Sequence, residues 1–280
     1  MKYLRLPFFI LAFFAIGTFT LSAAQLSSVK TLNVTGSVTK YSLDGKSSAL
    51  AAGDILKKGD SLSASALSSA KLVFSNGSII DVKENTSISI AEFMQDQFSG
   101  GSTYEQLQAD PSKSQVILEL NYGEIDGHVK QLRQGSEFDI QTPIGTAAIR
   151  GTQFTVSLTF DAERGEYTLV VTNKDGTVLI KSRYADKFEY RNGIGKKPFD
   201  SSIKDNSSES IPKAHSIIIR LNKSDPYYDE VFKLLSSFTP PEDQGRPPVI
   251  IKIVTDPDDP GIQIVSPNTE DDQGDDNDNQ

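Results

Sequence analysis

Cysteine and tryptophan are absent from this chain of 280 residues, and histidine occurs only at His128 and His215. The absence of cysteine excludes disulfide frameworks, cysteine-ligated zinc, iron–sulfur clusters and cysteine nucleophiles. Two histidines far apart in the sequence exclude a histidine-rich metal site, and without tryptophan there is no indole platform for a sugar ring. We therefore expect a protein that needs no cofactor and carries little catalytic equipment.

Positive charge is also scarce, because 28 basic residues face 37 acidic ones and the net charge is −9. This balance argues against nucleic acid as a partner. The excess of acidic residues is confined to the end of the chain. Nine acidic residues and no Lys or Arg lie between 256 and 280, whereas the net charge of 25–255 is close to zero. The tail 256–280 has too little apolar surface to offset the entropy of ordering, which predicts disorder there.

Clustered carboxylates give this tail a second interpretation, because they suit a hard cation such as Ca²⁺. The weak candidate ligands are Asp271, Asp272, Asp275 and Asp276. The spacing of an EF-hand loop is missing, so a solvated tail is favoured over a calcium site.

The first 24 residues have the three parts of a secretory signal. Lys2 and Arg5 precede an apolar stretch from 6 to about 21, and small residues predict cleavage between Ala24 and Gln25. The apolar run is shorter than the ~20 residues of a spanning helix, which disfavours an uncleaved anchor. An exported chain without cysteine suits the periplasm or surface of a bacterium, with no transmembrane span after cleavage.

The body of the chain has the patterns of short β-strands. Asn76-Gly77 separates two apolar runs and predicts a hairpin whose turn residues both take positive φ. The alternation in 86–91 predicts a strand with one buried face. A second hairpin is predicted with its turn at 173–176. Turn signals at such close intervals favour an all-β fold, a compact sandwich or roll of solenoid-like character.

Three segments depart from this pattern. Residues 93–110 carry Gly100-Gly101 and a helical turn capped near Ser102 or Thr103, which indicates a surface insertion. A short amphipathic helix is predicted in 225–237, with Asp225 as its N-cap. The polar composition of 183–212 predicts a long loop or linker. The expected division is a signal peptide (1–24), a β domain (25–182), this linker, C-terminal strands with the helix (213–255), and the acidic tail.

Five blocks of sequence occur in a recognisable order. The first is Gly53-Asp54-Ile55-Leu56 or Gly59-Asp60-Ser61-Leu62, of which the second fits better. The others are the run 68–78, Glu84-Asn85-Thr86-Ser87-Ile88, the run 118–125, and the run 138–145 that leads into 150–156. The last pair, which reads TPIG followed by RGTQF, is the most specific. On these blocks, residues 31–181 resemble the FecR domain, found in the periplasmic sensor part of iron-siderophore regulators and in many envelope proteins. Those regulators place a cytoplasmic head and one membrane span before the domain, whereas here a cleavable signal stands in that place.

The resemblance implies a set of motif positions, which we expect to be mainly structural. They are Gly59, Asp60, Asn76, Gly77, Gly123, Thr142, Pro143, Gly145, Arg150, Gly151, Thr152 and Phe154. Arg150 is the charged residue of a small, apolar stretch and allows two interpretations. It either holds a ligand carboxylate or is tied to loop carbonyls or to an internal carboxylate such as Asp139, and the second is favoured because half-buried arginines are usually paired.

No G-x-S-x-G, P-loop or Rossmann fingerprint is present in the chain. Glu124 and Asp126 share one face of a strand, about 7 Å apart, and His128 follows two residues later. A solvated strand face explains this group better than a glycosidase site does. We therefore expect an exported, non-enzymatic module that binds an envelope protein or a glycan, by edge-strand pairing or through a polar face. The alternative is a structural envelope component that its acidic tail keeps soluble.

Overall fold

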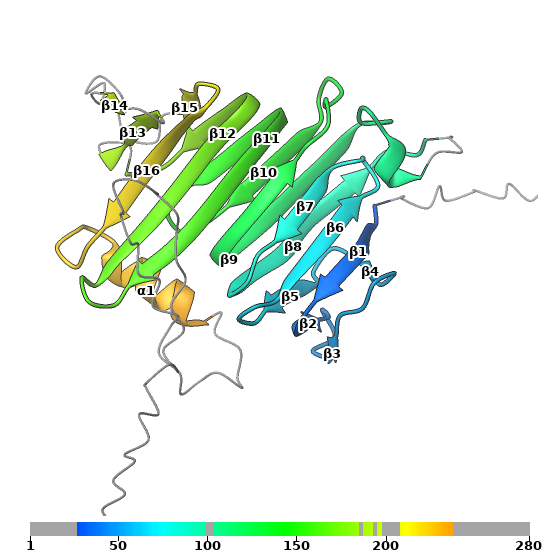
Figure 1. Cartoon of the computed structure of the whole chain (residues 1–280), viewed down its shortest axis with the longest axis horizontal. Helices are drawn as coiled ribbons and strands as arrows, with labels where there is room; N and C mark the ends of the chain where they lie inside the picture. The colour runs from blue at the N-terminus through cyan, green and yellow to red at the C-terminus, as the bar shows by residue number, and fades with distance from the viewer. Residues whose placement is uncertain (1–26, 99–102, 185–186, 193–194, 198–207, 238–280) are drawn as a thin grey trace, which may run out of the picture.

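The computed structural model describes residues 27–98, 103–184, 187–192, 195–197 and 208–237. Sixteen strands of these residues form one connected, open sheet, which confirms the expected all-β class (Figure 1). The predicted signal peptide and acidic tail, with its four aspartate candidates, lie outside the described residues. None of the described helices combines the length and the apolar character that crossing a membrane requires.

The strands are numbered in chain order. The first eight are β1 (Val29–Thr35), β2 (Val38–Tyr41), β3 (Ser47–Ala49), β4 (Ile55–Leu56), β5 (Ser61–Ala64), β6 (Ser69–Phe74), β7 (Ile79–Val82) and β8 (Thr86–Gln95). The others are β9 (Ser114–His128), β10 (Glu137–Gln141), β11 (Thr146–Asp161), β12 (Glu166–Lys181), β13 (Glu189–Asn192), β14 (Gly195–Lys197), β15 (Ser208–Ile211) and β16 (His215–Leu221). A 3₁₀ turn, η1 (Tyr104–Gln106), and one helix, α1 (Tyr228–Ser237), complete the described fold.

The sheet folds into two layers because three long strands belong to both. In the first layer the order is β3, β2, β5, β8, the first half of β9, β10, the start of β11, the end of β12, and β15. In the second layer it is β4, β1, β6, β7, the second half of β9, the rest of β11 and β12, β16, β13 and β14. Figure 1 shows the long strands β9, β11 and β12 running through the middle of the molecule.

Glycines mark where the long strands pass from one layer to the other. Gly123 divides β9 with a φ of +91°, and the chain of Asn85 and Thr86 lies directly against its α-carbon. Gly176 divides β12 with a φ of +95°, beside the backbone of Gly151 in β11. Only glycine takes this conformation without strain and leaves room for a neighbouring backbone.

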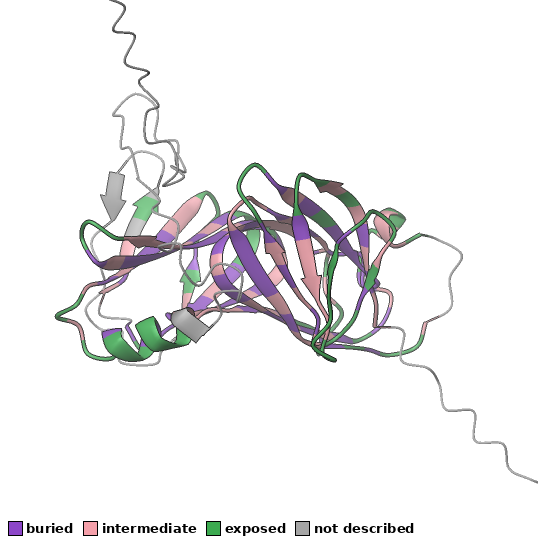
Figure 2. Cartoon of the chain, turned by 90° about the horizontal axis from the view of Figure 1, so that it is seen from below, coloured by how far each residue is buried: buried purple, intermediate pink, exposed green. Residues whose placement is uncertain are grey.

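The core lies between the layers, as the buried segments in Figure 2 show. Phe74 of β6 in the second layer packs against two rings of the first layer, Phe93 of β8 at 5.4 Å and Phe138 of β10 at 5.6 Å between ring centroids. All three side chains are almost fully buried. These contacts establish the face-to-face packing expected of a sandwich or roll.

Helix α1 covers a part of the second layer that extends beyond the first. Tyr228 and Val231 are buried in the core, and the ring of Tyr228 lies 5.5 Å from that of Tyr167 in β12. The expected helix is therefore present, but its predicted N-cap is wrong. The helix begins three residues after Asp225, because Tyr227 takes a left-handed φ of +67°. The Asp225 carboxylate instead accepts the Asn222 backbone N–H at 2.8 Å and pairs with Lys187.

The hairpin predictions were half right. Strands β6 and β7 do form a hairpin, but Asn76 lacks the predicted positive φ, and Gly77 alone among the turn residues has one, at +86°. The predicted turn at 173–176 is wrong. Those residues lie inside the 16-residue strand β12, whose pairing with β11 continues on both sides of an irregularity. The actual turn between these strands lies at 162–165.

Two other segments gain structure from pairing with the sheet. The predicted linker 183–212 contains strands β13, β14 and β15 among its described residues, and β15 pairs with β12. The predicted surface insertion 93–110 begins as the end of β8 and then forms η1 after Thr103. Tyr104 and Glu105 of η1 contact β1 and the residue before it, through Ser28 at 3.2 Å and Lys30 at 3.9 Å.

Candidate functional site

The outer surface of the first layer is covered by short polar side chains. Their alternation with buried Val38, Leu62, Ala64 and Ile88 directs them away from the core. Strand register aligns them across four strands, Tyr41 with Ser61 and Ser61 with Ser89, for example. The surface, here called the hydroxyl face, consists of Thr39, Tyr41, Ser61, Ser63, Ser87, Ser89, Asn121 and Tyr122.

A β-bulge in β9 brings the largest polar groups onto this face. The register between β8 and β9 shifts after Ser87, so Asn121 is an extra residue next to Tyr122. The Asn121 amide donates hydrogen bonds to the hydroxyls of Ser87 at 3.3 Å and Ser89 at 3.4 Å. These bonds fix the serine hydroxyls in place while Ser61, Ser63 and Ser89 stay partly accessible to solvent.

One row of the face continues across the whole first layer. From Ser89 it passes to Glu119, Gln141, Thr146 and Lys181, which are register partners on successive strands. Eight strands from β3 to β12 lie side by side along this row, and a spacing of about 4.8 Å gives a length of roughly 34 Å. The arrangement is an elongated polar surface rather than a pocket for a small molecule.

The far end of this row opens into a hollow of about 600 Å³. We call it the Tyr227 hollow, and its lining residues are Thr142, Pro143, Gly145, Thr146, Lys181, Ser182, Arg183 and Tyr227. Tyr227 is 58% exposed, and the Arg183 guanidinium lies 5.2 Å from the centroid of the Tyr227 ring. Lys181, Arg183 and the ring of Tyr227 thus lie around the turn of the TPIG motif, the most specific part of the sequence resemblance.

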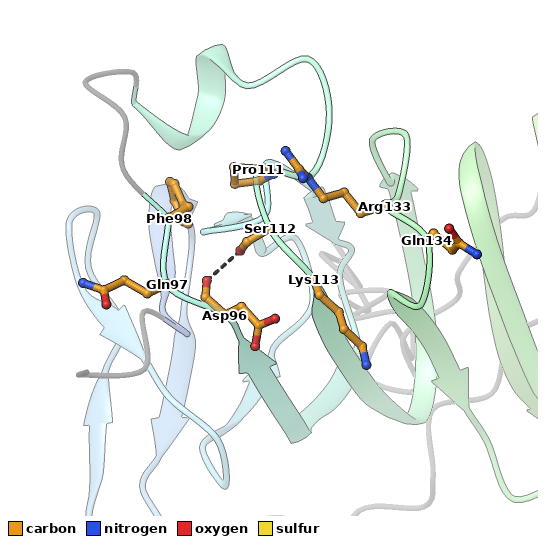
Figure 3. Close-up of a pocket in the computed structure, with 8 residues that line it drawn as sticks. All are labelled: Asp96, Gln97, Phe98, Pro111, Ser112, Lys113, Arg133 and Gln134. Atoms are coloured by element: carbon orange, nitrogen blue, oxygen red, sulfur yellow. Dashed lines mark hydrogen bonds between the residues drawn. The ribbon is translucent and has the colours of Figure 1, made fainter. Parts of the chain in front are cut away.

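A second hollow of similar size, about 620 Å³, lies beside the insertion (Figure 3). Within it the Ser112 hydroxyl donates to the Asp96 carbonyl at 2.6 Å. Figure 3 shows Gln97 and Gln134 pointing away from each other on opposite sides, so these two amides do not converge on one ligand. The remaining lining residues are Phe98, Pro111, Lys113 and Arg133.

A buried carboxylate supports this second hollow. Asp110 is 2% exposed, and its Oδ2 accepts hydrogen bonds from the hydroxyls of Ser114 and Ser136, both at 2.8 Å. The Asp110 carbonyl accepts the Arg133 Nε–H at 3.1 Å. The aspartate ties the insertion to β9 and to the segment before β10, which is a role in the fold.

Most of the predicted motif residues are placed in turns and strand crossings. Asp60 follows the Gly59 turn, accepts the Lys57 backbone N–H at 3.0 Å and pairs with Lys40 at 3.2 Å. Asn76 is fully buried in its hairpin, where it bonds the Ser78 N–H and the Ser114 hydroxyl. These residues organise the backbone and are not assembled into one site.

The second group of motif residues lies around β11. The Thr142 hydroxyl donates to the Gly145 carbonyl at 2.8 Å and so closes the turn that contains Pro143. Thr152 and Asn173 join β11 to β12 at 3.1 Å next to Gly151, and Phe154 is buried in the core. Of all the motif residues, Thr142, Pro143 and Gly145 alone also line the Tyr227 hollow.

Arg150 contacts the carboxylate that the second interpretation named, Asp139. Its Nη1 lies 3.7 Å from Oδ1 of Asp139 and donates to the Ile149 carbonyl at 3.2 Å. Burial raises the pKa of Asp139, and the Arg150 charge only partly opposes this rise. The Arg150 guanidinium thus contacts Asp139 on the neighbouring strand β10.

The acidic pair of β9 lies on the outer surface of the second layer, within an ion-pair network. Asp126 pairs with Lys83 at 2.9 Å and Lys174 at 2.7 Å, and its Oδ1 accepts the Thr155 hydroxyl at 2.5 Å. Burial disfavours its charged form, but the hydrogen bonds from Lys174, Thr155 and Lys83 outweigh that and lower the pKa to about 2. Burial and the Asp126 charge raise the pKa of Glu124. Both Asp126 oxygens are engaged in these contacts, and the low pKa makes this carboxylate a weak base.

His128 lies at the end of the same strand, and burial together with the Lys130 charge lowers its pKa. His215 begins β16, where its Nδ1 lies 2.8 Å from the Lys213 carbonyl. Neither histidine adjoins the hydroxyl face. Among the described residues no group of three or more His, Asp or Glu side chains is arranged to hold a metal ion.

Sequence reasoning anticipated a polar face and named Thr142, Pro143 and Gly145, but it missed the other residues of the Tyr227 hollow. The alternation in 86–91, which predicts Ile88 and Ile90 on a buried face, also directs Ser87 and Ser89 to the opposite face. Lys181, Arg183 and Tyr227 carried no such signal, because they meet only when β12, the TPIG turn and the start of α1 come together in three dimensions.

Comparison with known proteins gives one family match, in the middle of the chain. Residues 60–179 match the family model described as FecR protein, which confirms the resemblance drawn from the sequence. The search of curated proteins found no match. Two crystal structures of a candidate anti-sigma factor from Parabacteroides distasonis align with 13% identity over 59% of this chain, with TM-scores of 0.36 and 0.35. The alignments span 55% and 56% of those chains, just over half their length.

Proposed function

We propose, from the FecR-family identity of residues 60–179, that this protein is an exported, non-enzymatic binding module that recognises an envelope protein or a glycan. Family membership supports a role in envelope signalling. The observation that carries the proposal is the hydroxyl face, which presents an elongated, ordered row of donors and acceptors on the outside of the first layer. The signal peptide predicted in 1–24 would deliver the protein to the envelope.

A polar face suits recognition better here than edge-strand pairing does. The strands at the ends of the two layers have three residues (β3), four (β15), two (β4) and three (β14). Such short edges offer few unpaired backbone groups to an added strand. The central strands present fixed side chains instead, and Tyr41 and Tyr122 supply the larger surfaces from which affinity usually comes.

The test uses bulky, charged substitutions on the face and one matched control. Ser63→Arg and Ser89→Arg place a long cation on the hydroxyl face, and Asn33→Arg does the same at an exposed position of β1 in the second layer. Residues 25–280 of each variant serve as bait for crosslinking in envelope extract, with mass spectrometry as the readout. We expect one dominant partner for the unmodified protein and for Asn33→Arg, and its loss for both serine variants.

Equal capture by all variants would contradict recognition through the face. If the bait recovers only itself, the alternative of a structural, self-associating component is favoured. Circular dichroism of each variant checks that the fold is retained, because all three sites are polar surface positions whose substitution should change stability by no more than about 0.5 kcal/mol.

A further inference from the structure

Three chain segments that are distant in sequence build the Tyr227 hollow. The TPIG turn contributes Thr142, Pro143 and Gly145, the end of β12 and the residues after it contribute Lys181 and Arg183, and Tyr227 precedes α1. Thr146 and Lys181 are register partners at the end of the row that begins on the hydroxyl face. The hollow therefore continues that face.

Two cations of the hollow are available to an anion. Lys181 is exposed, and because Ile180 is buried its side chain points outward. The ion pairs formed by the described part of the chain do not involve Lys181. Arg183 pairs with Glu230 at 3.4 Å, but both side chains are about half exposed, so this surface pair is weak. A guanidinium and an ammonium together suit a carboxylate.

Tyr227, the residue before α1, has an unusual backbone conformation. Its φ of +67° is left-handed, a conformation that costs a residue with a β-carbon roughly 1–2 kcal/mol. Its side chain is mostly exposed, so core packing does not explain the strain. Strain of this kind tends to accumulate at ligand-binding positions, where it fixes a side chain in advance. The result is an exposed ring with Arg183 beside it.

We propose that the Tyr227 hollow binds a uronic acid unit of an acidic polysaccharide, with the carboxylate on Lys181 and Arg183 and the apolar face of the sugar ring against Tyr227. This inference rests on the proposed function and narrows its ligand to an anionic glycan. The neighbouring sugar unit would lie against Thr146 and Gln141, the uncharged residues of the row next to the hollow.

The surface favours a saccharide over a peptide. Peptides are usually held by strand addition at an open edge or by pockets for apolar side chains. The hydroxyl face consists of central strands whose backbone groups are already paired with neighbouring strands. The partly accessible residues of this face are Thr39, Ser61, Ser63, Ser89 and the two tyrosines, whose hydroxyls complement a chain of sugar hydroxyls, whereas Asn121 and Ser87 are buried beneath them.

Calorimetric titration of residues 25–280 with trigalacturonate and with trimannuronate tests the proposal, and the fully methyl-esterified trigalacturonate is the neutral control. We expect one of the two acidic trimers to bind, with an affinity that falls as the salt concentration is raised. If trigalacturonate is the one that binds, its methyl ester should bind at least tenfold more weakly. Failure of both acidic trimers to bind would overturn the proposal, as would an ester that binds equally well.

Variants locate the site. Lys181→Gln should weaken binding at least tenfold, whereas Lys113→Gln removes the same charge from the second hollow and should leave the affinity unchanged. Tyr227→Gly removes the ring and relieves the left-handed strain, so it should weaken binding while keeping or raising the melting temperature. The opposite pattern for the two lysines, or a melting temperature that falls in Tyr227→Gly, would overturn the assignment. The proposed function fails separately, if Ser63→Arg and Ser89→Arg still capture the partner.

Discussion

At the scale of single residues, several motif positions lie where the backbone turns or crosses. Gly123 illustrates this, because β9 changes layer at this residue and the loop of Asn85 and Thr86 crosses directly over it. The Thr86 hydroxyl accepts the Glu124 N–H at 2.9 Å and so fastens the crossing. A motif of this kind is visible in sequence as isolated glycines, but its partner loop is not, since Gly123 lies 37 positions after Thr86.

The first prediction concerns this crossing. A β-carbon at position 123 would lie 2.5 Å from the Asn85 carbonyl oxygen and closer still to Thr86, in addition to the strain of φ +91°. Gly123→Ala should therefore destabilise the protein by about 3 kcal/mol or more. Gly45→Ala is the control, with a φ of +80° and no atom near its β-carbon, and should cost only about 1 kcal/mol. Urea denaturation measures both, and equal losses would show that the close approach is unimportant.

The second prediction concerns Asp126 and acid. Its pKa of about 2 in the folded protein lies below the roughly 3.9 of an unfolded chain. The carboxylate therefore stabilises the fold above about pH 4, and this stabilisation is lost as the pH falls from 4 toward 2. Asp126→Asn removes two ion pairs and should lower stability by roughly 1 kcal/mol at pH 7.

The pH dependence separates this effect from simple damage to the fold. Between pH 4 and 2 the unmodified protein should lose more stability than Asp126→Asn, so the two denaturation curves converge in acid. Urea titrations at pH 7, 4 and 2.5 test this, with Asp44→Asn, which alters an exposed pair with Lys46, as the control. A constant difference between the curves at all three pH values would argue against the ion-pair network.

At the scale of elements, the sequence predicts strands well where polar and apolar residues alternate along the chain. It predicts them poorly where pairing with a distant strand determines the backbone conformation. Ile88 and Ile90 of β8 were expected on a buried face and lie there. The residues 173–176 have the composition of a turn, yet β11 pairs along β12 on both sides of them and holds the chain extended. The same reason explains β15, because its polar sequence becomes a strand through its pairing with the end of β12.

The third prediction concerns α1, which has one buried face. Val231 is 2% exposed beneath the helix, whereas Lys233 is exposed on the other side. Val231→Ala should lower the free energy of unfolding by about 1.5 kcal/mol, and Lys233→Ala should change it by less than about 0.5 kcal/mol. Hydrogen exchange in β16 and in the start of β12 should accelerate in Val231→Ala alone. Unchanged exchange there would mean that the helix does not protect the sheet.

At the scale of the whole molecule, the predicted boundaries at 182 and 212 do not coincide with breaks in the sheet. Seven residues of β16 pair with β12, and Arg220 of β16 pairs with Glu166 of β12 at 3.5 Å and with Glu189 of β13 at 2.6 Å. The sequence shows the composition of each segment but not which distant strands pair with each other. The polar stretch after β12 was therefore interpreted as a linker. The hollow around Tyr227 was missed for the same reason.

This continuity leads to the fourth prediction, on cooperativity. Strands β9, β11 and β12 belong to both layers, so neither layer can unfold while the other keeps its strands. Differential scanning calorimetry of residues 25–280 should show one transition, with equal calorimetric and van't Hoff enthalpies. A chain that ends at 182 loses β16 and α1, which exposes Leu169 and Val171 of β12, and should melt at least 10 °C lower or aggregate. Two separate transitions, or an unchanged melting temperature after truncation, would mean that the segment after β12 folds independently of the sheet. Tyr227 belongs to that segment, so it would then not be held in a fixed position against the other residues of the hollow.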